Sequence, residues 1–300
     1  MFLWFKKEKP KNKINKSVYD RNVYDRKIIT FVTCWYIMKS KFPVEKYVSW
    51  IQNFLSIVNN FNLIIYTDIT SYNTISNIPY IRNEKIKIII KPIEDFYTYK
   101  YKEKWINNHN ISNLDLHKHI SWKLNMLWNE KIFFVLDAIK KNYFNTMYYG
   151  WCDIGYFRNS IDDLHSKYLS KWPNYLTLLN DNFRTFPIHY SCIQNNVLKY
   201  VSLMNDIKTH YKENKSTPPT NNILENCFAG GFFILQKEIA EIYSNIYDKK
   251  LNYYFDNNYI IKDDQTIIMD IIFTNPNLFY THYEDNPNYN NWFMFQRLLL

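Results

Sequence analysis

Only four glycines occur among the 300 residues, and they fall in two short segments. Gly150 and Gly155 bound the sequence Gly-Trp-Cys-Asp-Ile-Gly, and Gly230 and Gly231 interrupt Phe-Ala-Gly-Gly-Phe-Phe. Glycine is needed where φ is positive or where another group approaches the backbone closely. A chain with so little glycine is therefore predicted to place these four where no other residue fits. We interpret both segments as walls of one ligand site.

The composition indicates a globular protein with a large core. Hydrophobic residues make up 47% of the chain and aromatic residues 19%, which favours one domain over 27–300 after a flexible basic arm at 1–26. No apolar run is long enough for a transmembrane helix, and the apolar residues at the start are too few for a signal peptide. The cysteines form no CxxC pair and are expected to be reduced core thiols of a cytoplasmic protein; they are Cys34, Cys152, Cys192 and Cys227.

The net charge of +9 raises the question of a nucleic-acid partner. The lysines are scattered along the chain rather than clustered, and a basic patch is the feature that indicates nucleic-acid binding. The abundance of Lys, Asn, Ile, Tyr and Phe is instead typical of an AT-rich genome, such as that of a virus, parasite or bacterium. We therefore predict no nucleic-acid partner, and a place in the host cytoplasm or the virion if the source is viral.

Apolar strands alternate with helical segments along the chain. Strands are predicted at 27–33, 62–67, 86–91, 147–151, 228–235 and 278–281. Helices are predicted at 43–58, 119–141, 195–212, 237–249 and 264–273. This alternation predicts an α/β fold with a mostly parallel central sheet flanked by helices.

Polar residues at strand ends indicate where a ligand binds, because open α/β sheets bind ligands at the carboxyl ends of their strands. Thr33, Asp68 and Asp153 stand at such ends. Asp68 serves equally well as a helix cap or turn residue. Asp153 follows a buried strand and precedes Gly155, so we interpret it as a ligand of Mn²⁺ or Mg²⁺. Arg158 is either a phosphate ligand or an ion-pair partner that fixes the turn.

Two further segments carry candidate site residues. The Gly230-Gly231 pair is either a β-bulge or tight helix contact, or a floor for a flat ligand such as a sugar ring. Asp263, Asp264 and Gln265 open an apolar helix, where one aspartate is expected to cap the helix and the other to point into the site with Gln265. His282 ends the last predicted strand and is either a metal ligand or a surface histidine.

Six segments together resemble the HtrL/YibB (WlaTC/HtrL) family over about residues 27–295. They are Phe-Val-Thr-Cys-Trp-Tyr (31–36), Ser-Lys-Phe-Pro (40–43), Trp-Asn-Glu-Lys (128–131), Trp-Cys-Asp-Ile-Gly-Tyr-Phe-Arg (151–158), Ala-Gly-Gly-Phe-Phe (229–233) and Asp-Asp-Gln (263–265). That family is similar to glycosyltransferases of the GT-A fold. The resemblance implies a GT-A-like, Rossmann-type sandwich and transfer of a sugar from a nucleoside-diphosphate sugar, with a UDP-sugar favoured, to a glycan or protein-linked acceptor.

The resemblance also implies roles for individual residues. Asp153 stands where GT-A enzymes carry an Asp-x-Asp motif for Mn²⁺ or Mg²⁺, and the second aspartate of that motif is missing here. His282 or a carboxylate near the C-terminus is then expected to supply another metal ligand. The remaining donor contacts are expected from Thr33, Asp68, Lys123, Gly155, Arg158, Gly230 and Gly231.

Two mechanisms and three functions remain open from the sequence. An inverting transferase, the favoured choice, would use Asp264 as its base, and a retaining one would use Gln265. The diphosphate leaving group calls for a divalent cation rather than a protein acid. The alternatives to a transferase are an inactive sugar-nucleotide or glycan-binding protein on the same scaffold, and a basic protein associated with nucleic acid.

Overall fold

The computed structural model describes residues 28–220, 222–284 and 286–300, so the predicted arm at 1–26 lies outside the described residues. Its strands are β1 (Ile29–Trp35), β2 (Asn62–Thr67), β3 (Ile86–Ile90), β4 (Tyr148–Cys152), β5 (Ile188–Cys192), β6 (Phe228–Gln236) and β7 (Phe279–His282). Its helices are α1 (Val44–Ser56), α2 (Ile69–Ile75), α3 (Lys102–Ile111), α4 (Asp115–His119), α5 (Trp122–Asn129), α6 (Lys131–Lys141), α7 (Tyr175–Leu178), α8 (Asp181–Thr185), α9 (Val197–Glu213), α10 (Ala240–Asp256), α11 (Asp264–Thr274) and α12 (Met294–Leu298).

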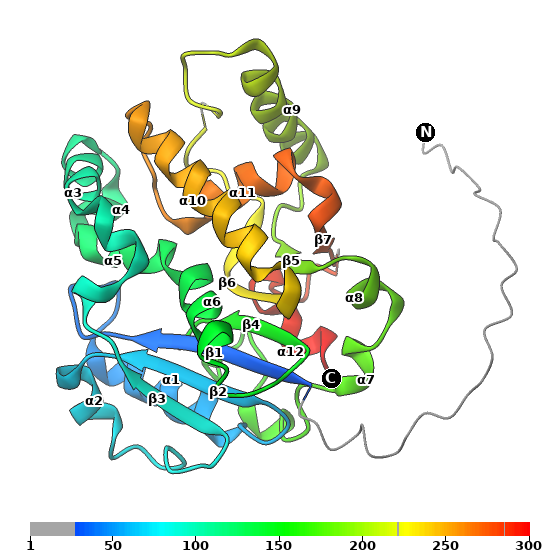
Figure 1. The fold of residues 1–300 in the computed structure, drawn as a ribbon. Helices are drawn as coiled ribbons and strands as arrows, with labels where there is room; N and C mark the ends of the chain where they lie inside the picture. The colour runs from blue at the N-terminus through cyan, green and yellow to red at the C-terminus, as the bar shows by residue number, and fades with distance from the viewer. Residues whose placement is uncertain (1–27, 221, 285) are drawn as a thin grey trace, which may run out of the picture.

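The strands form a seven-stranded sheet in the order β3-β2-β1-β4-β6-β5-β7. The neighbours β3, β2, β1 and β4 are parallel, and β5 is parallel to β7. Strand β6 runs antiparallel to both β4 and β5. The predicted α/β fold with a mostly parallel sheet flanked by helices is confirmed (Figure 1).

Both faces of the sheet are buried at β1, β2, β4 and β6, which explains why these strands appear in the sequence as mostly apolar runs. In β1, Phe31 packs with α1 and the C-terminal helix α12 in one core cluster, while Val32 packs on the opposite face with α6 and α10. Successive side chains of a strand point to opposite faces, so each run supplies both layers. The four cysteines are free thiols and buried, as predicted.

The prediction of one long helix over 119–141 is wrong, because the structure divides this segment into α4, α5 and α6. Ser121 has extended backbone before α5. Between α5 and α6, the buried Glu130 carboxylate accepts hydrogen bonds from the backbone N–H of Tyr97 and Thr98, at 2.6 and 2.9 Å. The break makes Lys131 the first residue of α6.

Strand β5 was not predicted, although it is fully buried. Its sequence, Ile-His-Tyr-Ser-Cys, alternates apolar and polar residues and lacks the apolar run of the other central strands. His189 and Ser191 nonetheless lie in the interior. Within the described ranges, no helix is both long and apolar enough to cross a membrane.

Candidate functional site

A cleft of about 530 Å³ lies at the carboxyl ends of β1 and β4. Its walls come from the segment between β1 and α1, the α5–α6 junction, the turn after β4, the first half of β6, the start of α11, and Trp292. Pockets for small ligands commonly measure about 300–1,000 Å³, so the cleft has room for one. Its position is the one that the strand-end argument predicts.

Asp153 projects into the cleft from the turn that follows β4. Its backbone N–H donates to the Gly231 carbonyl at 2.8 Å, which ties the turn to β6. Its Oδ1 accepts a hydrogen bond from Trp151 Nε1 at 2.6 Å. The side chain is 35% exposed, so this carboxylate is fixed on one side and open to the cleft on the other.

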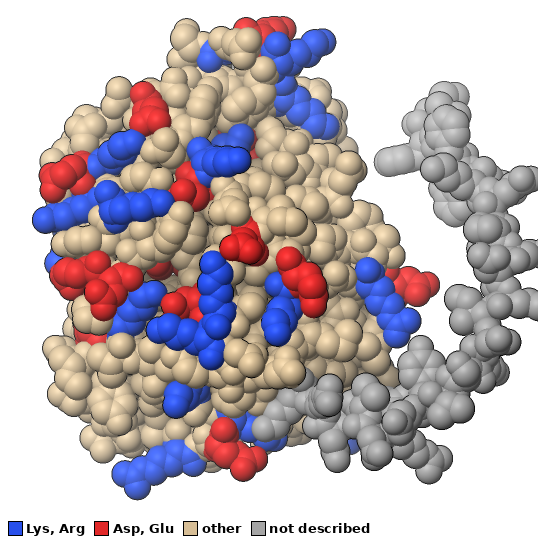
Figure 2. Space-filling view, in the orientation of Figure 1, with Lys and Arg blue, Asp and Glu red and all other residues tan. Residues whose placement is uncertain are grey.

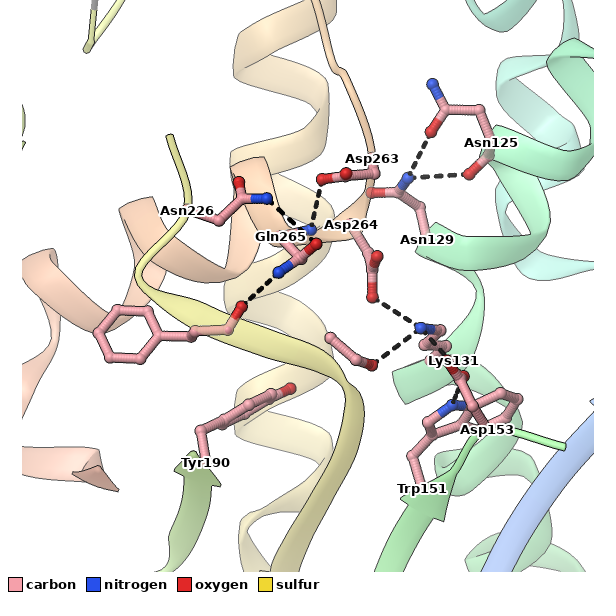
Figure 3. A network of polar contacts seen from close by, with 12 residues as sticks. Asn125, Asn129, Lys131, Trp151, Asp153, Tyr190, Asn226, Asp263, Asp264 and Gln265 are labelled. Atoms are coloured by element: carbon pink, nitrogen blue, oxygen red, sulfur yellow. Dashed lines mark hydrogen bonds and ion pairs between the residues drawn. The ribbon is translucent and has the colours of Figure 1, made fainter. Parts of the chain in front are cut away.

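Lys131 lies between the two carboxylates of the site (Figure 3). Its Nζ is 3.2 Å from Asp153 Oδ1 and 2.9 Å from Asp264 Oδ2, and it donates to the Gly230 carbonyl at 2.8 Å. Burial alone would lower the pKa of this lysine, but the charges of Asp153 and Asp264 outweigh burial and hold the pKa above its ordinary value. Lys131 is therefore a buried, permanently charged ammonium.

The start of α11 provides the second carboxylate. Asp263 caps the helix by accepting from the Gln265 backbone N–H at 3.1 Å, as expected of one of the two aspartates, and Asp264 points to Lys131. Burial raises the pKa of Asp264 to about 6, and Lys131 opposes that rise. Gln265 lines the cleft, but both ends of its amide are occupied by Phe228 O at 2.5 Å and Asn226 Nδ2 at 3.1 Å.

Buried amides hold the segment that leads into α11. Asn108 Nδ2 donates to Tyr259 O at 2.7 Å, and Asn108 Oδ1 accepts from the Ile261 N–H at 3.0 Å. Asn125 Nδ2 donates to Ile261 O at 2.8 Å. Helices α3 and α5 therefore determine where Asp264 is placed.

The four glycines are explained by close approach rather than by positive φ, which none of them has. A Cβ on Gly230 would lie 2.5 Å from Asp264 Oδ2, and one on Gly155 would lie 2.7 Å from the Trp50 ring. A Cβ on Gly231 would lie 3.1 Å from Trp292 Nε1 and 3.2 Å from Asp153 Oδ2. Gly150 faces Phe31 and the Phe233 carbonyl in the core, so it is not a wall of the cleft. The space above Gly230 is taken by a carboxylate, and contact of either Gly230 or Gly231 with a sugar stays a prediction.

The structure brings together part of the predicted set. Asp153, Gly155, Arg158, Gly230, Asp264 and Gln265 all line the cleft. Arg158 Nε donates to Gly155 O at 2.8 Å, and its guanidinium lies 4.7 Å from the centre of the Trp50 ring. Arg158 therefore braces the turn after β4 while its side chain remains at the cleft.

The other predicted residues, Gly231 included, are not among those that line the cleft. Thr33 is buried within β1. Asp68 caps α2 by accepting from the Ser71 N–H at 2.7 Å. Lys123 lies 5.9 Å from the centre of the Trp122 ring. His282 Nε2 is 3.0 Å from His189 Nδ1, in a buried pair. Their predicted roles in binding stay predictions.

Sequence reasoning missed Lys131 as a site residue, although the Trp-Asn-Glu-Lys segment contains it. No local signal distinguishes Lys131, because it stands beside the charged Glu130 at the edge of the apolar run Ile-Phe-Phe-Val-Leu and not within it. The aromatic walls at Trp50, Trp128 and Trp292 were missed as well.

Mn²⁺ or Mg²⁺, which the resemblance implies, would need several oxygen ligands around one position. The described residues contain no group of three or more His, Cys, Asp and Glu side chains placed to hold a metal. The cleft carboxylates Asp153 and Asp264 already share the Lys131 ammonium. The donor set as built does not fit a divalent cation.

Charge on the surface is mixed. On the face shown in Figure 2, Lys and Arg side chains lie among Asp and Glu side chains, without a continuous basic area over the residues that are drawn in colour. At the cleft, Lys39, Lys41, Lys131 and Arg158 stand against Asp153, Asp263 and Asp264. The cationic side chains outnumber the acidic ones there, which favours an anionic ligand.

Solved structures with a similar fold include transferases of two kinds. Mouse xyloside xylosyltransferase 1 is 12% identical, with 85% of this chain and 84% of that chain covered and a TM-score of 0.48. The galactosyltransferase LgtC, solved with donor and acceptor sugar analogues, is 8% identical over 90% of this chain and 95% of that chain, with a TM-score of 0.43. A cytidylyltransferase from Leptospira borgpetersenii serovar Hardjo-bovis is 11% identical over 88% and 80%, with a TM-score of 0.41.

No curated protein sequence matches the chain. A family model does match, over residues 32–299, and it is described as "Bacterial protein of unknown function (HtrL_YibB)". The match spans nearly the whole of the described structure and includes every residue of the cleft. The chain belongs to the HtrL/YibB family.

Proposed function

We propose that this protein is a glycosyltransferase that moves a sugar from a nucleoside-diphosphate sugar, with a UDP-sugar favoured, to a glycan or protein-linked acceptor. The observation that carries the proposal is the cleft at the carboxyl ends of β1 and β4, where the buried cation Lys131 and the carboxylates Asp153 and Asp264 meet. A cation supports an anionic diphosphate, and aromatic walls such as Trp128 and Trp292 support a sugar ring. The sequence resemblance supports the reaction class.

The proposed chemistry is direct displacement at the anomeric carbon. The acceptor oxygen forms a bond to that carbon, and the bond from that carbon to the diphosphate oxygen breaks, its electron pair leaving with the nucleoside diphosphate. The acceptor proton passes to Asp264, whose pKa of about 6 is close to neutral pH, where a general base is most effective. This is an inverting mechanism, in keeping with a Gln265 amide that is occupied at both ends.

The first test is ligand-dependent stability. We expect one of UDP, GDP, CDP, ADP and dTDP to raise the melting temperature by about 4 °C when it is present at a hundred times its dissociation constant. The matching sugar nucleotide is then incubated with candidate glycan acceptors, and release of the nucleoside diphosphate is followed.

Asp153→Asn tests the site itself. It is expected to lower transfer by at least about tenfold, because an amide in place of the Asp153 carboxylate no longer orients the Lys131 ammonium toward the cleft. Asp162→Asn is the matched control, since Asp162 is exposed on a loop and does not line the cleft. Binding without turnover on any acceptor would favour the inactive sugar-nucleotide-binding protein. If no nucleotide stabilises the protein, both the transferase and the sugar-nucleotide-binding protein are excluded.

A further inference from the structure

Lys131 occupies the position between two cleft carboxylates where a bound cation would be expected. Its Nζ contacts one oxygen of Asp153, one oxygen of Asp264 and the Gly230 carbonyl, at 3.2, 2.9 and 2.8 Å. The contact with the Gly230 carbonyl is a hydrogen bond, and the contacts with the two carboxylates are ion pairs. The side chain is only 8% exposed, and it nevertheless lines the cleft.

The contact with Asp153 is the one that a ligand can replace at least cost. It is the longest of the three, and Asp153 Oδ1 keeps a second donor, Trp151 Nε1, at 2.6 Å. Asp264 and Gly230 are both buried and continue to hold the ammonium. One N–H of Lys131 is thereby available to an anionic oxygen that enters from the open side of Asp153.

The rest of the cleft supports binding of a diphosphate by side chains alone. Among the described residues, its lining has four cationic side chains and three acidic ones, so their summed charge is positive without any added ion. Burial strengthens the hydrogen bond that Lys131 can donate to a diphosphate oxygen, because a charged hydrogen bond is stronger where water is excluded.

We propose that Lys131 takes the place of the divalent cation, so that this protein binds and cleaves its donor without a metal; the proposal rests on the function proposed above. As the bond between the anomeric carbon and the diphosphate oxygen breaks, the electron pair stays on that oxygen, and Lys131 stabilises the new negative charge with an N–H hydrogen bond. The ammonium keeps its proton, and the acceptor proton still goes to Asp264. Lys131 is thus a catalytic residue that touches the leaving group.

The decisive experiment compares metal-free and metal-loaded protein. The five nucleoside diphosphates are tested by thermal shift in excess EDTA and in Mn²⁺. We expect stabilisation in EDTA, unchanged by Mn²⁺, and sugar-nucleotide turnover that EDTA does not reduce. Stabilisation that appears only with Mn²⁺ would overturn the inference and leave the proposed function standing. Stabilisation under neither condition would overturn the proposed function itself.

Variants at Lys131 test the residue directly. Lys131→Met is expected to weaken metal-free binding of the stabilising nucleotide by about 10- to 100-fold, the loss that follows removal of a charged hydrogen bond. Lys140→Met is the matched control, because Lys140 is exposed at the far end of the same helix, where it pairs with Glu241. Equal binding by wild type and Lys131→Met in EDTA would refute the role of Lys131.

Lys131→Met leaves two carboxylates without their cation, so its melting temperature is measured first. If it does not fold, Lys131→Met combined with Asp264→Asn removes the surplus charge, and nucleotide binding in EDTA is read from that variant. Lys131→Ala tests the exchange of ammonium for metal through a gain of binding. Removal of the lysine side chain leaves a space between Asp153 and Asp264 that is expected to admit Mn²⁺, so Mn²⁺ should restore nucleotide binding in Lys131→Ala and should not change it in wild type. Failure of Mn²⁺ to restore binding in a folded Lys131→Ala would count against the proposed exchange of ammonium for metal.

Discussion

Replacement of single glycines by alanine tests whether β6 is packed against the site as closely as the structure shows. A Cβ on Gly230 would lie 2.5 Å from Asp264 Oδ2, well inside contact distance. The Asp264 side chain cannot yield freely, because it is buried against Lys131 at 2.9 Å. Gly230→Ala is therefore expected to push the carboxylate away from the ammonium.

The expected magnitudes follow from what each new methyl group meets. Overpacking costs about 1–3 kcal/mol, and the loss of glycine freedom in the unfolded chain returns about 0.4–1 kcal/mol. Gly230→Ala should then lower the free energy of unfolding by about 1–2 kcal/mol. Gly231→Ala should lose less than about 1 kcal/mol, because its contacts of 3.1 and 3.2 Å require shifts of only a few tenths of an ångström. Gly150→Ala should lose about 3 kcal/mol or more, because its Cβ would lie 2.6 Å from the backbone carbonyl of Phe233.

The assay is urea unfolding of the three variants, together with the nucleotide-induced thermal shift. The expected order of destabilisation is Gly150, Gly230, Gly231. Gly230→Ala should lose most of the nucleotide-induced shift, whereas Gly150→Ala, if folded, should keep it, because Gly150 faces the core rather than the cleft. A Gly230→Ala protein as stable as Gly231→Ala, with a full nucleotide shift, would refute the close packing of Gly230 on Asp264.

Three further predictions concern groups around the site. Asn108→Ala should lower the free energy of unfolding by about 2–4 kcal/mol, because it leaves two buried backbone groups without partners, whereas Asn107→Ala, at an exposed position, should change it by less than about 0.5 kcal/mol. If Asp264 is the base, the rate of transfer should fall as the pH drops below about 6, where this carboxyl becomes protonated. Asp264→Asn should abolish transfer at every pH. A wild-type rate that stays constant down to pH 5 in a folded enzyme would exclude Asp264 as the base. Burial, with the neighbouring histidine, lowers the pKa of His282 to about 3, so the unfolded chain binds a proton at this histidine at a higher pH than the folded protein does, and the stabilising contribution of neutral His282 is present above about pH 6.5 and lost as the pH falls. In urea unfolding, the stability advantage of wild type over His282→Gln should therefore shrink by about 2 kcal/mol between pH 7.5 and 5. The exposed His165→Gln variant should show no such change.

The strands that the sequence predicts well are those with an uninterrupted apolar run. Residues 62–67 were predicted with the bounds that the structure has, because a strand buried on both faces needs apolar side chains throughout. Strand β5 escaped prediction, because His189 is paired with His282 and a strand with a satisfied polar pair in its interior has no such run. The pattern of apolar residues predicts which apolar side chains are buried, but it does not predict a buried polar side chain whose hydrogen-bond partner lies far away in the sequence.

The division of 119–141 was unpredictable for a related reason. The periodic apolar pattern continues through Glu130, but the Glu130 carboxylate binds backbone N–H groups of residues 97 and 98, some thirty positions earlier. Nothing local in the sequence signals that contact. The same contact lies at the break that makes Lys131 the first residue of α6.

The strand-end argument located Asp153 correctly because it depends only on strand direction. Asp68, which the sequence left open between a helix cap and a role in binding, stands at an equivalent strand end and caps α2. The difference lies in the order of strands, which the sequence does not reveal. Asp68 follows β2, which lies beside β1 on the side away from β4 and outside the β1–β4 pair that borders the cleft, whereas Asp153 follows β4 itself.

The reversal of β6 is what allows remote segments to share one ammonium. Because β6 is antiparallel to β4, its first half lies beside the carboxyl end of β4, and Gly231 O accepts the Asp153 N–H there. A parallel strand would bring its last residues to that edge, and the chain would then leave the site at once. The antiparallel strand enters at the site, gives the Gly230 carbonyl to Lys131, and leaves room over a bare Cα for Asp264. The glycine pair therefore belongs at the start of this strand, and only glycine lets the carboxylate of α11 reach an ammonium that is held by β6 itself.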